Sequence, residues 1–367
     1  MARLEPFPGI RYAVGGGVLD DLVAPPYDVI SEDERARLEA RSAHNAVRVE
    51  LPRDEGGRSR YEEAAHLFDR WRGEGVLVAD PPSLYVYRMR YADEGGRRRS
   101  TIGVIGALGL RGGDGDEVLP HERTTPKDKA DRLEILRATG VNLSPIWGLS
   151  QTAGLSSRLE ALTGAAPEAV ATDDAGVVHE LWRVDDHAAV EGVGAAVASA
   201  PVLVADGHHR LEVAVAHLAE ADGTARPGAE AIMAYVVELV DEQLLVQAVH
   251  RLVGGVAPAE LLSALAAYFG VEPLDGPLDV GILSRMTEAG ALCLLAAVQG
   301  VEVRYQHGFD EVRAAVDKGD ADAAVLLRPA TVAQIAQVSR GGARMPPKTT
   351  FFSPKPRTGM VFRSLAG

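Results

Sequence analysis

Residues 201–210 read PVLVADGHHR, and the apolar positions that follow them are Leu211, Ala214, Val215 and Leu218. The short apolar run at the start predicts a strand, and the later spacing of i, i+3, i+4 and i+7 predicts an amphipathic helix. A tight polar turn, Asp206–Arg210, would connect the two. Because further stretches of both kinds intermix along the chain, we expect an α/β or α+β protein.

The polar turn concentrates chemically active side chains at the expected start of a helix. It holds a carboxylate, a glycine, two imidazoles and a guanidinium. The backbone N–H groups and partial positive charge of a helix N-terminus make it a seat for phosphate. Gly207 would let the backbone approach a ligand closely, and Arg210 could hold phosphate oxygens through two parallel hydrogen bonds. The alternative is a structural turn, in which Asp206 caps the helix and the histidines lie on the surface.

The composition is typical of a soluble globular chain. Its 367 residues are enough for two or more domains, and 46% of them are apolar and 25% charged. No apolar run reaches the length of about eighteen residues that spans a bilayer, and residues 1–6 lack the apolar region of a signal peptide. The single cysteine, Cys293, lies in an apolar run and is expected to pack as a small hydrophobic residue. These features predict a cytoplasmic protein with no membrane segment.

The charge is distributed unevenly along the chain. The net charge of −14 disfavours attraction to nucleic acid or to an anionic membrane. Residues 323–367, however, contain seven Lys and Arg and no Asp or Glu, so this tail carries +7 and the remainder −21. Local basicity of this kind predicts either docking against the chain's own acidic face or contact with an anionic ligand.

Several other segments have recognisable start and stop signals. They predict helices from Ser31 to about Arg41, from Tyr61 to about Gly73, and from Pro126 to just before Gly140, and a β-hairpin of Leu84–Tyr91 with Thr101–Leu110. Further on, strands are expected at 231–240, 244–249, 291–298 and 301–306, and helices at 257–269, 278–289 and 329–339. The proline-rich stretch 345–359 cannot form regular helix, and its aromatic residues predict that it packs on the body.

Two more clusters could join the turn in one site. One is His121-Glu122-Arg123, just before the helix expected from Pro126, and the other is the basic tail with Lys355 and Arg357. A phosphoryl-transfer site needs cations for the phosphate charge, a group that accepts a hydroxyl proton, and carboxylates for Mg²⁺. Glu122 or Asp206 could serve as the base and as the Mg²⁺ ligand. A zinc site is disfavoured because neighbouring histidines rarely bind one ion and no His-x-x-x-His or Cys-x-x-Cys framework is present.

Five motifs, in order, resemble one bacterial and archaeal family. They are APPYDVIS (24–31), PHERT (120–124), DRLEILRATGVNLSPI (131–146), ADGHHR (205–210) and MPPKTTFFSPKPRTGMVF (345–362). Together they resemble the domain-of-unknown-function family 1015 over essentially the full length. The name of this family implies no function.

The turn itself is similar to the phosphate-binding turn of the ParB/sulfiredoxin-like fold, in its free serine kinase branch. Those kinases carry Asp-Gly-His-His-Arg or a close variant, and an earlier glutamate serves as the catalytic base, a place that Glu122 would take. The resemblance implies a core over residues 116–255, an N-terminal α+β region at 1–115 and a C-terminal α/β region with the basic tail at 256–367. His208 stands where a sulfiredoxin has its cysteine, which disfavours sulfinic acid repair.

On this basis we expect a nucleotide-dependent phosphotransferase for a small hydroxyl metabolite, with free L-serine as the leading acceptor. The expected site residues are these: catalytic Glu122, Asp206 and His209; ATP- or ADP-binding Gly207, His208, His209, Arg210, Arg123, Lys355 and Arg357; and Mg²⁺-binding Glu122 and Asp206. The alternatives are a phosphatase acting on a metabolite such as phosphoserine, and a non-catalytic nucleotide-binding switch related to ParB. The acidic composition disfavours the switch, and a homodimer is possible.

Overall fold

The computed structural model describes residues 2–13, 17–93, 95–110, 118–120, 126–220, 228–267, 302–340 and 348–366. They form two compact units, Met1–Leu244 with Pro354–Gly367, and Leu245–Ser353. Some predicted features lie outside the described residues: His121, Glu122, Arg123, the segment with Cys293, and the elements expected at 278–289 and 291–298. Within the described residues, strands and helices intermix, which confirms the mixed α/β class.

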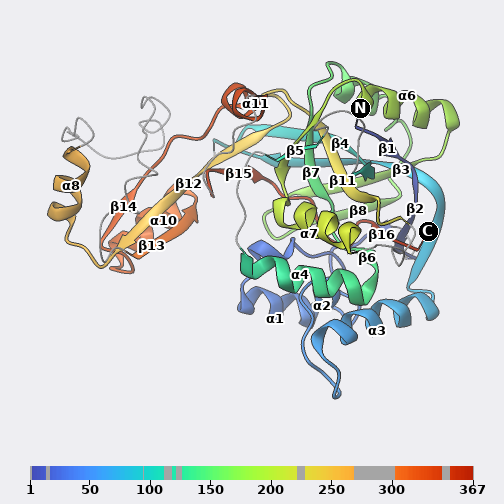
Figure 1. Ribbon diagram of the computed structural model, residues 1–367, viewed down its shortest axis with the longest axis horizontal. Helices are drawn as coiled ribbons and strands as arrows, with labels where there is room; N and C mark the ends of the chain where they lie inside the picture. The colour runs from blue at the N-terminus through green and yellow to red at the C-terminus, as the bar shows by residue number, and fades with distance from the viewer. Residues whose placement is uncertain are drawn as a thin grey trace. The chain divides into compact units, whose positions relative to one another are not determined.

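The first unit is built on one large mixed sheet (Figure 1). Its main path runs β5-β10-β7-β11-β4-β3-β2-β16-β6, with β1, β8 and β9 paired off this path. The strands are β1 (Leu4–Glu5), β2 (Phe7–Tyr12), β3 (Leu77–Ala92), β4 (Arg98–Gly109), β5 (Val118–Pro120), β6 (Val141–Asn142), β7 (Ile146–Ser150), β8 (Ala169–Thr172), β9 (Val178–Val184), β10 (Val202–Asp206), β11 (Ala231–Glu238) and β16 (Phe362–Ser364). The predicted hairpin is confirmed as the antiparallel pair β3–β4.

The helices of this unit include those predicted to follow Ser31, to begin near Tyr61 and at Pro126, and to follow the polar turn, and three that the sequence analysis did not assign, at 47–50, 155–160 and 187–198. They are α1 (Glu32–Arg41), α2 (Val47–Glu50), α3 (Arg60–Gly73), α4 (Pro126–Thr139), α5 (Leu155–Glu160), α6 (His187–Ala198) and α7 (His208–Ala219), with a 3-10 turn at Tyr27–Val29. The Ser31 side chain caps α1, as predicted, by accepting from the N–H of Glu34. Pro126 opens α4, and Gly140 follows its end with a positive φ of 63°.

The predicted strand–turn–helix unit is confirmed as β10, Gly207 and α7. β10 pairs with β5 in parallel and with β7 in antiparallel orientation, and β7 in turn pairs with β11 in parallel. In the β10–β5 pair, Val204 lies opposite Pro120. Because parallel strands point the same way, the chain leaves β5 at the edge of the sheet where the polar turn begins.

The buried face of α7 differs from the predicted one. Leu211 and Ala214 pack into the main core, as expected, but Val215 is 47% exposed. Val213 is buried instead, in a small cluster with Leu136 of α4 and Leu365. The helix is covered on two sides, by the sheet and by α4 (Figure 1), so its buried surface turns away from Val215.

The second unit has its own four-stranded sheet, counted over the described residues. Its strands are β12 (Leu245–Gly254), β13 (Glu302–His307), β14 (Ala323–Val325) and β15 (Thr350–Ser353), and its helices are α8 (Pro258–Ala266), α10 (Phe309–Asp317) and α11 (Val332–Arg340). The helices predicted at 257–269 and 329–339 are thus confirmed, and the strand predicted at 301–306 pairs with β12. The sequence analysis missed α10, which buries Phe309 and Val312.

The end of the chain is extended and packed, as its prolines and aromatic residues predict. Residues 350–353 and 362–364 form the strands β15 and β16, and Phe352 and Phe362 are fully buried. Over the part of the chain that the structure describes, no helix has the length and apolar character to cross a bilayer.

Candidate functional site

Gly207 holds the polar turn in a conformation that a side chain would disturb. It is the N-cap of α7, with φ 87° and ψ 26° in the left-handed region. A Cβ atom built there would lie 2.9 Å from Cγ2 of Ile146 and 3.0 Å from Nη2 of Arg210. The cap makes no side-chain hydrogen bond. The N-cap position of α7 is therefore taken by Gly207 and not by Asp206.

Asp206 instead holds two cations beside the helix end. Nζ of Lys355 donates to its Oδ1 at 2.6 Å, and Nη2 of Arg210 donates to its Oδ2 at 2.9 Å. The same Lys355 ammonium also donates to Oδ2 of Asp28 at 2.8 Å. The prediction that the basic tail docks on acidic residues of its own chain is confirmed here.

The charges of this cluster stabilise one another. Burial opposes the charged form of Asp206, but Lys355 and Arg210 outweigh it and hold the pKa of Asp206 well below its usual range. Burial also opposes the charged forms of the two cations, yet their carboxylate partners raise the pKa of Lys355 and of Arg210. All three groups therefore remain ionised near neutral pH, and Asp206 is a weak proton acceptor.

Arg210 connects the turn to a second buried carboxylate. Its Nη1 donates to Oγ of Ser144 at 3.0 Å and also to the carbonyl of Pro145. The hydroxyl of Ser144 donates in turn to Oε1 of Glu50 at 3.2 Å, and the N–H of Tyr27 donates to the same oxygen at 3.3 Å. Burial raises the pKa of Glu50, although Arg132 and Arg210 oppose the shift.

A cavity of about 50 Å³ lies beside this chain of contacts. Its polar lining consists of Tyr27, Glu50, Arg132, Asn142, Ser144 and Arg210, and its apolar lining of Ile135, Leu136, Val141, Leu143, Val213 and Ile232. The sequence analysis did not single out Glu50 or Ser144. The signal for Glu50 was an acidic residue among apolar ones, in the stretch Val47–Leu51.

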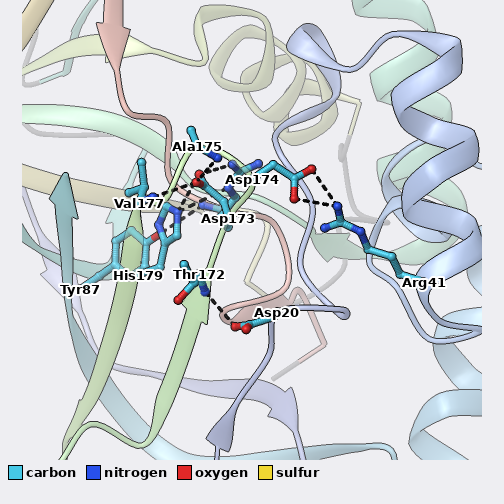
Figure 2. Close-up of polar contacts among 10 residues, drawn as sticks. Asp20, Arg41, Tyr87, Thr172, Asp173, Asp174, Ala175, Val177 and His179 are labelled. Atoms are coloured by element: carbon cyan, nitrogen blue, oxygen red, sulfur yellow. Dashed lines mark hydrogen bonds and ion pairs between the residues drawn. The ribbon is translucent and has the colours of Figure 1, made fainter. Parts of the chain in front are cut away.

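Arg357 lies in a different network from that of Lys355. Its guanidinium pairs with Asp173 and contacts Nε2 of His179 at 3.5 Å, and its N–H donates to the Tyr87 hydroxyl at 3.1 Å. Figure 2 shows Asp173 in the turn between β8 and β9, close to His179 and Val177. These partners fix the tail segment that carries Lys355 onto the sheet, so the structure favours an anchoring role for Arg357.

The carboxylate of Asp173 accepts several hydrogen bonds and ion pairs. It accepts hydrogen bonds from the N–H groups of Ala175 and Val177, each at 2.9 Å (Figure 2). Burial opposes its charged form, but His179 and Arg357 hold the pKa of Asp173 well below its usual range. Burial lowers the pKa of His179, which keeps this imidazole neutral at neutral pH.

The structure thus brings most of the predicted residues together. Asp206, Gly207, His208, His209, Arg210 and Lys355 lie at or against the turn, and His208 and His209 are half-buried in the first turn of α7. Glu122 and Arg123 lie outside the described residues. The fit to a phosphate is good, because a glycine-capped helix end lies beside two cations, Arg210 and Lys355, whose side chains are only 13% and 8% exposed.

The described residues do not by themselves fit a metal ion. Among them, no group of three or more His, Cys, Asp or Glu could hold one. Two carboxylates at the turn, those of Asp28 and Asp206, both bind the Lys355 ammonium. The expectation of Mg²⁺ at Asp206 therefore remains a prediction.

Comparison with known proteins assigns the chain to a family. The chain belongs to the family described as "Protein of unknown function (DUF1015)", whose model matches residues 4–335. This confirms the full-length resemblance. A search of curated proteins finds no match.

Several solved structures are similar to this chain. A free serine kinase variant in complex with ADP is similar over 72% of this chain and 92% of its own, at 15% identity and a TM-score of 0.42. A conserved hypothetical protein from Pyrococcus furiosus is similar over 72% and 95%, at 15% identity and a TM-score of 0.39. SbnI from Staphylococcus aureus is similar over 70% and 86%, at 13% identity and a TM-score of 0.39. At these values the likeness does not decide what the present chain binds.

Proposed function

We propose that the protein is a nucleotide-dependent phosphotransferase that acts on a small hydroxyl metabolite, with free L-serine as the leading acceptor. The observation that carries the proposal is the glycine-capped N-terminus of α7 with Arg210 and Lys355 held beside it by Asp206. The Asp-Gly-His-His-Arg sequence of the turn, which is similar to that of the free serine kinases, supports ATP or ADP as the donor.

The turn offers backbone N–H groups, a helix dipole and two cationic side chains to the phosphates of a nucleotide. The first-turn backbone of α7, including His208 and His209, would face the phosphate oxygens, and the helix dipole favours their negative charge. Arg210 and Lys355 remain cationic at neutral pH because their carboxylate partners raise their pKa. The ion pairs also hold both side chains in place before a ligand arrives, which reduces the entropy lost on binding.

The low pKa of Asp206 argues against this carboxylate as the general base. A base works best when its pKa lies near the operating pH. We therefore assign Asp206 the positioning of Lys355 and Arg210, and Glu122 the acceptance of the hydroxyl proton. The register supports this assignment, because β5 ends at Pro120 opposite Val204, two residues before Asp206. Mg²⁺, when bound with the nucleotide, would neutralise phosphate charge.

The reaction can be followed directly by ³¹P NMR on the full-length protein with ATP, Mg²⁺ and L-serine. A phosphoserine signal that grows with time supports the kinase, and a Glu122→Gln variant should lower its rate by at least about a hundredfold. Glu134→Gln is the matched control, because Glu134 lies exposed on α4 and pairs only with Arg137 among the contacts described. Hydrolysis of added phosphoserine, without a nucleotide requirement, would favour the phosphatase. If no phosphoryl group is transferred from ATP or ADP to the acceptor, the proposed phosphotransferase function is refuted.

A further inference from the structure

We propose that the cavity beside Arg210 is the acceptor pocket, and that Glu50 and Arg210 bind the hydroxyl group of the acceptor. This inference rests on the proposed phosphotransferase function and names a part of its site that the turn alone does not define. It also sets a chemical class for the acceptor.

Two side chains that line this cavity, those of Glu50 and Arg210, each carry a buried polar atom without a hydrogen-bond partner among the described residues. Glu50 is 1% exposed, and its Oε2 accepts no hydrogen bond from the described residues. The Nε–H of Arg210 is also buried and has no acceptor among them. Buried polar atoms without a partner are rare in folded proteins because each one costs about 1–3 kcal/mol. Such a pair therefore indicates a site that a ligand completes.

The two atoms belong to side chains that are both hydrogen-bonded to the hydroxyl of Ser144. Ser144 Oγ receives a hydrogen bond from Arg210 at 3.0 Å and gives one to Oε1 of Glu50 at 3.2 Å. Glu50 and Arg210 are thus held next to each other, and both line the cavity. The free atom of Glu50, Oε2, is a hydrogen-bond acceptor, and that of Arg210, the Nε–H, is a donor.

This combination selects the chemistry of the ligand. A hydroxyl group can accept from Nε of Arg210 and donate its one proton to Oε2 of Glu50 in the resting complex, and the same proton turns to Glu122 when the phosphoryl group is transferred. An ammonium group has only donors, and a carboxylate or phosphate has only acceptors. The pocket therefore favours a hydroxyl over either kind of charged group.

The size and the remaining lining restrict the ligand further. A water molecule needs about 10–15 Å³ of such space, so a cavity of about 50 Å³ holds only a few non-hydrogen atoms. Apart from the polar side chains already named, the wall is aliphatic and includes Leu143, Val213 and Ile232. We therefore assign the pocket to the small hydroxyl-bearing end of the acceptor. A hydroxymethyl group fits this description, and a sugar ring does not.

Arg210 connects the cavity to the helix end that would bind the phosphates. Its Nη2 binds Asp206 beside the helix N-terminus, and the same side chain lines the cavity and carries the buried Nε–H. A hydroxyl bound by this guanidinium would lie close to a phosphate seated on the turn. Proximity of the two reacting groups is a large part of what an enzyme contributes to a two-substrate reaction.

Saturation-transfer NMR tests the pocket on the full-length protein in the presence of ADP. The probes are L-serine, L-homoserine, ethanolamine and glycerol, and L-alanine is the control without a hydroxyl group. At least one hydroxyl probe should bind while alanine does not. Binding of alanine as strong as that of serine, or of none of the four probes, would overturn the inference.

Two variants separate the pocket from the nucleotide site. Glu50→Gln removes the acceptor charge, and Val213→Leu adds a methylene group to the cavity wall. Each should weaken binding of the hydroxyl probe by about tenfold or more and leave the affinity for ADP within about twofold. Glu238→Gln is the matched control, because this carboxylate is also buried, at 7% exposed, and is already bonded to the N–H groups of Gly154 and Ser156.

The outcomes of the two proposals remain distinguishable. If the wild-type protein does not bind ADP, the proposed function fails. If it binds ADP but Glu50→Gln and Val213→Leu hold the probe as well as the wild type does, only the acceptor pocket fails. Thermal unfolding of each variant shows whether it is folded, and Val213→Leu keeps every polar group of the pocket in place.

Discussion

Replacement of Asp206 by asparagine should uncouple the two cations of the turn. The side chain keeps its shape but loses the charge that binds Lys355 at 2.6 Å and Arg210 at 2.9 Å. Removing one partner of a buried ion pair typically costs about 3–5 kcal/mol. Lys355 keeps Asp28 as a partner at 2.8 Å, so we expect a smaller loss of unfolding free energy, about 2–4 kcal/mol.

The unfolding free energy that Asp206→Asn loses should become smaller at acidic pH. Lys355 and Arg210 depress the pKa of Asp206 in the folded protein below its ordinary value of 3.8, so the stabilisation by Asp206 is present above that pH. It is lost as the pH falls through the lower folded value. The stability difference between the wild type and Asp206→Asn should therefore be constant from about pH 5 to 8 and shrink below about pH 4.

A double-mutant cycle with Lys355→Met measures the pair itself. Thermal unfolding of the wild type, both single variants and the double variant should give a coupling energy of at least about 1 kcal/mol between Asp206 and Lys355. The reasoning is refuted if the two effects simply add, or if Asp206→Asn lowers the unfolding free energy by less than about 0.5 kcal/mol.

Two further variants test the turn and the tail. Gly207→Ala should cost roughly 1–2 kcal/mol of backbone strain and weaken ADP binding, because its Cβ would press on Ile146 at 2.9 Å. Gly154→Ala is its control, since Gly154 has a similar φ of 80° but open space around it; equal effects on ADP binding would count against the turn. Arg357→Met should lower the melting temperature by leaving Asp173 without its guanidinium, while the affinity for ADP changes by less than about threefold. A larger loss of affinity at unchanged stability would assign Arg357 to the nucleotide instead.

The strand, turn and helix around Asp206 could be predicted because their signals are local. A short apolar run, a glycine and a helical spacing all lie within 201–218. The same holds for the β3–β4 hairpin and for the capped start of α1. In each case the pattern is set by neighbours in the chain.

Features that depend on distant parts of the chain could not be predicted in this way. Val215 follows the helical spacing but is exposed, because α4 packs on α7 and buries Val213 instead. Glu50 has only a weak signal in the sequence, as an acidic residue among apolar ones, and it is the fold that connects it to Arg210 through the hydroxyl of Ser144. The anchoring of the tail through Asp173 likewise joins residues that are far apart in the chain.

The measurement that tests the central claim most directly is the affinity for ADP, determined by isothermal titration calorimetry on the full-length protein. We predict saturable binding to the wild type and at least about a tenfold loss in Arg210→Ala, because a charge-assisted contact to phosphate would be removed. Arg97→Ala should bind as the wild type does, since Arg97 is an exposed arginine in the β3–β4 turn that pairs with Asp93. No binding of ADP to the wild type, or equal affinity in Arg210→Ala, would contradict the account.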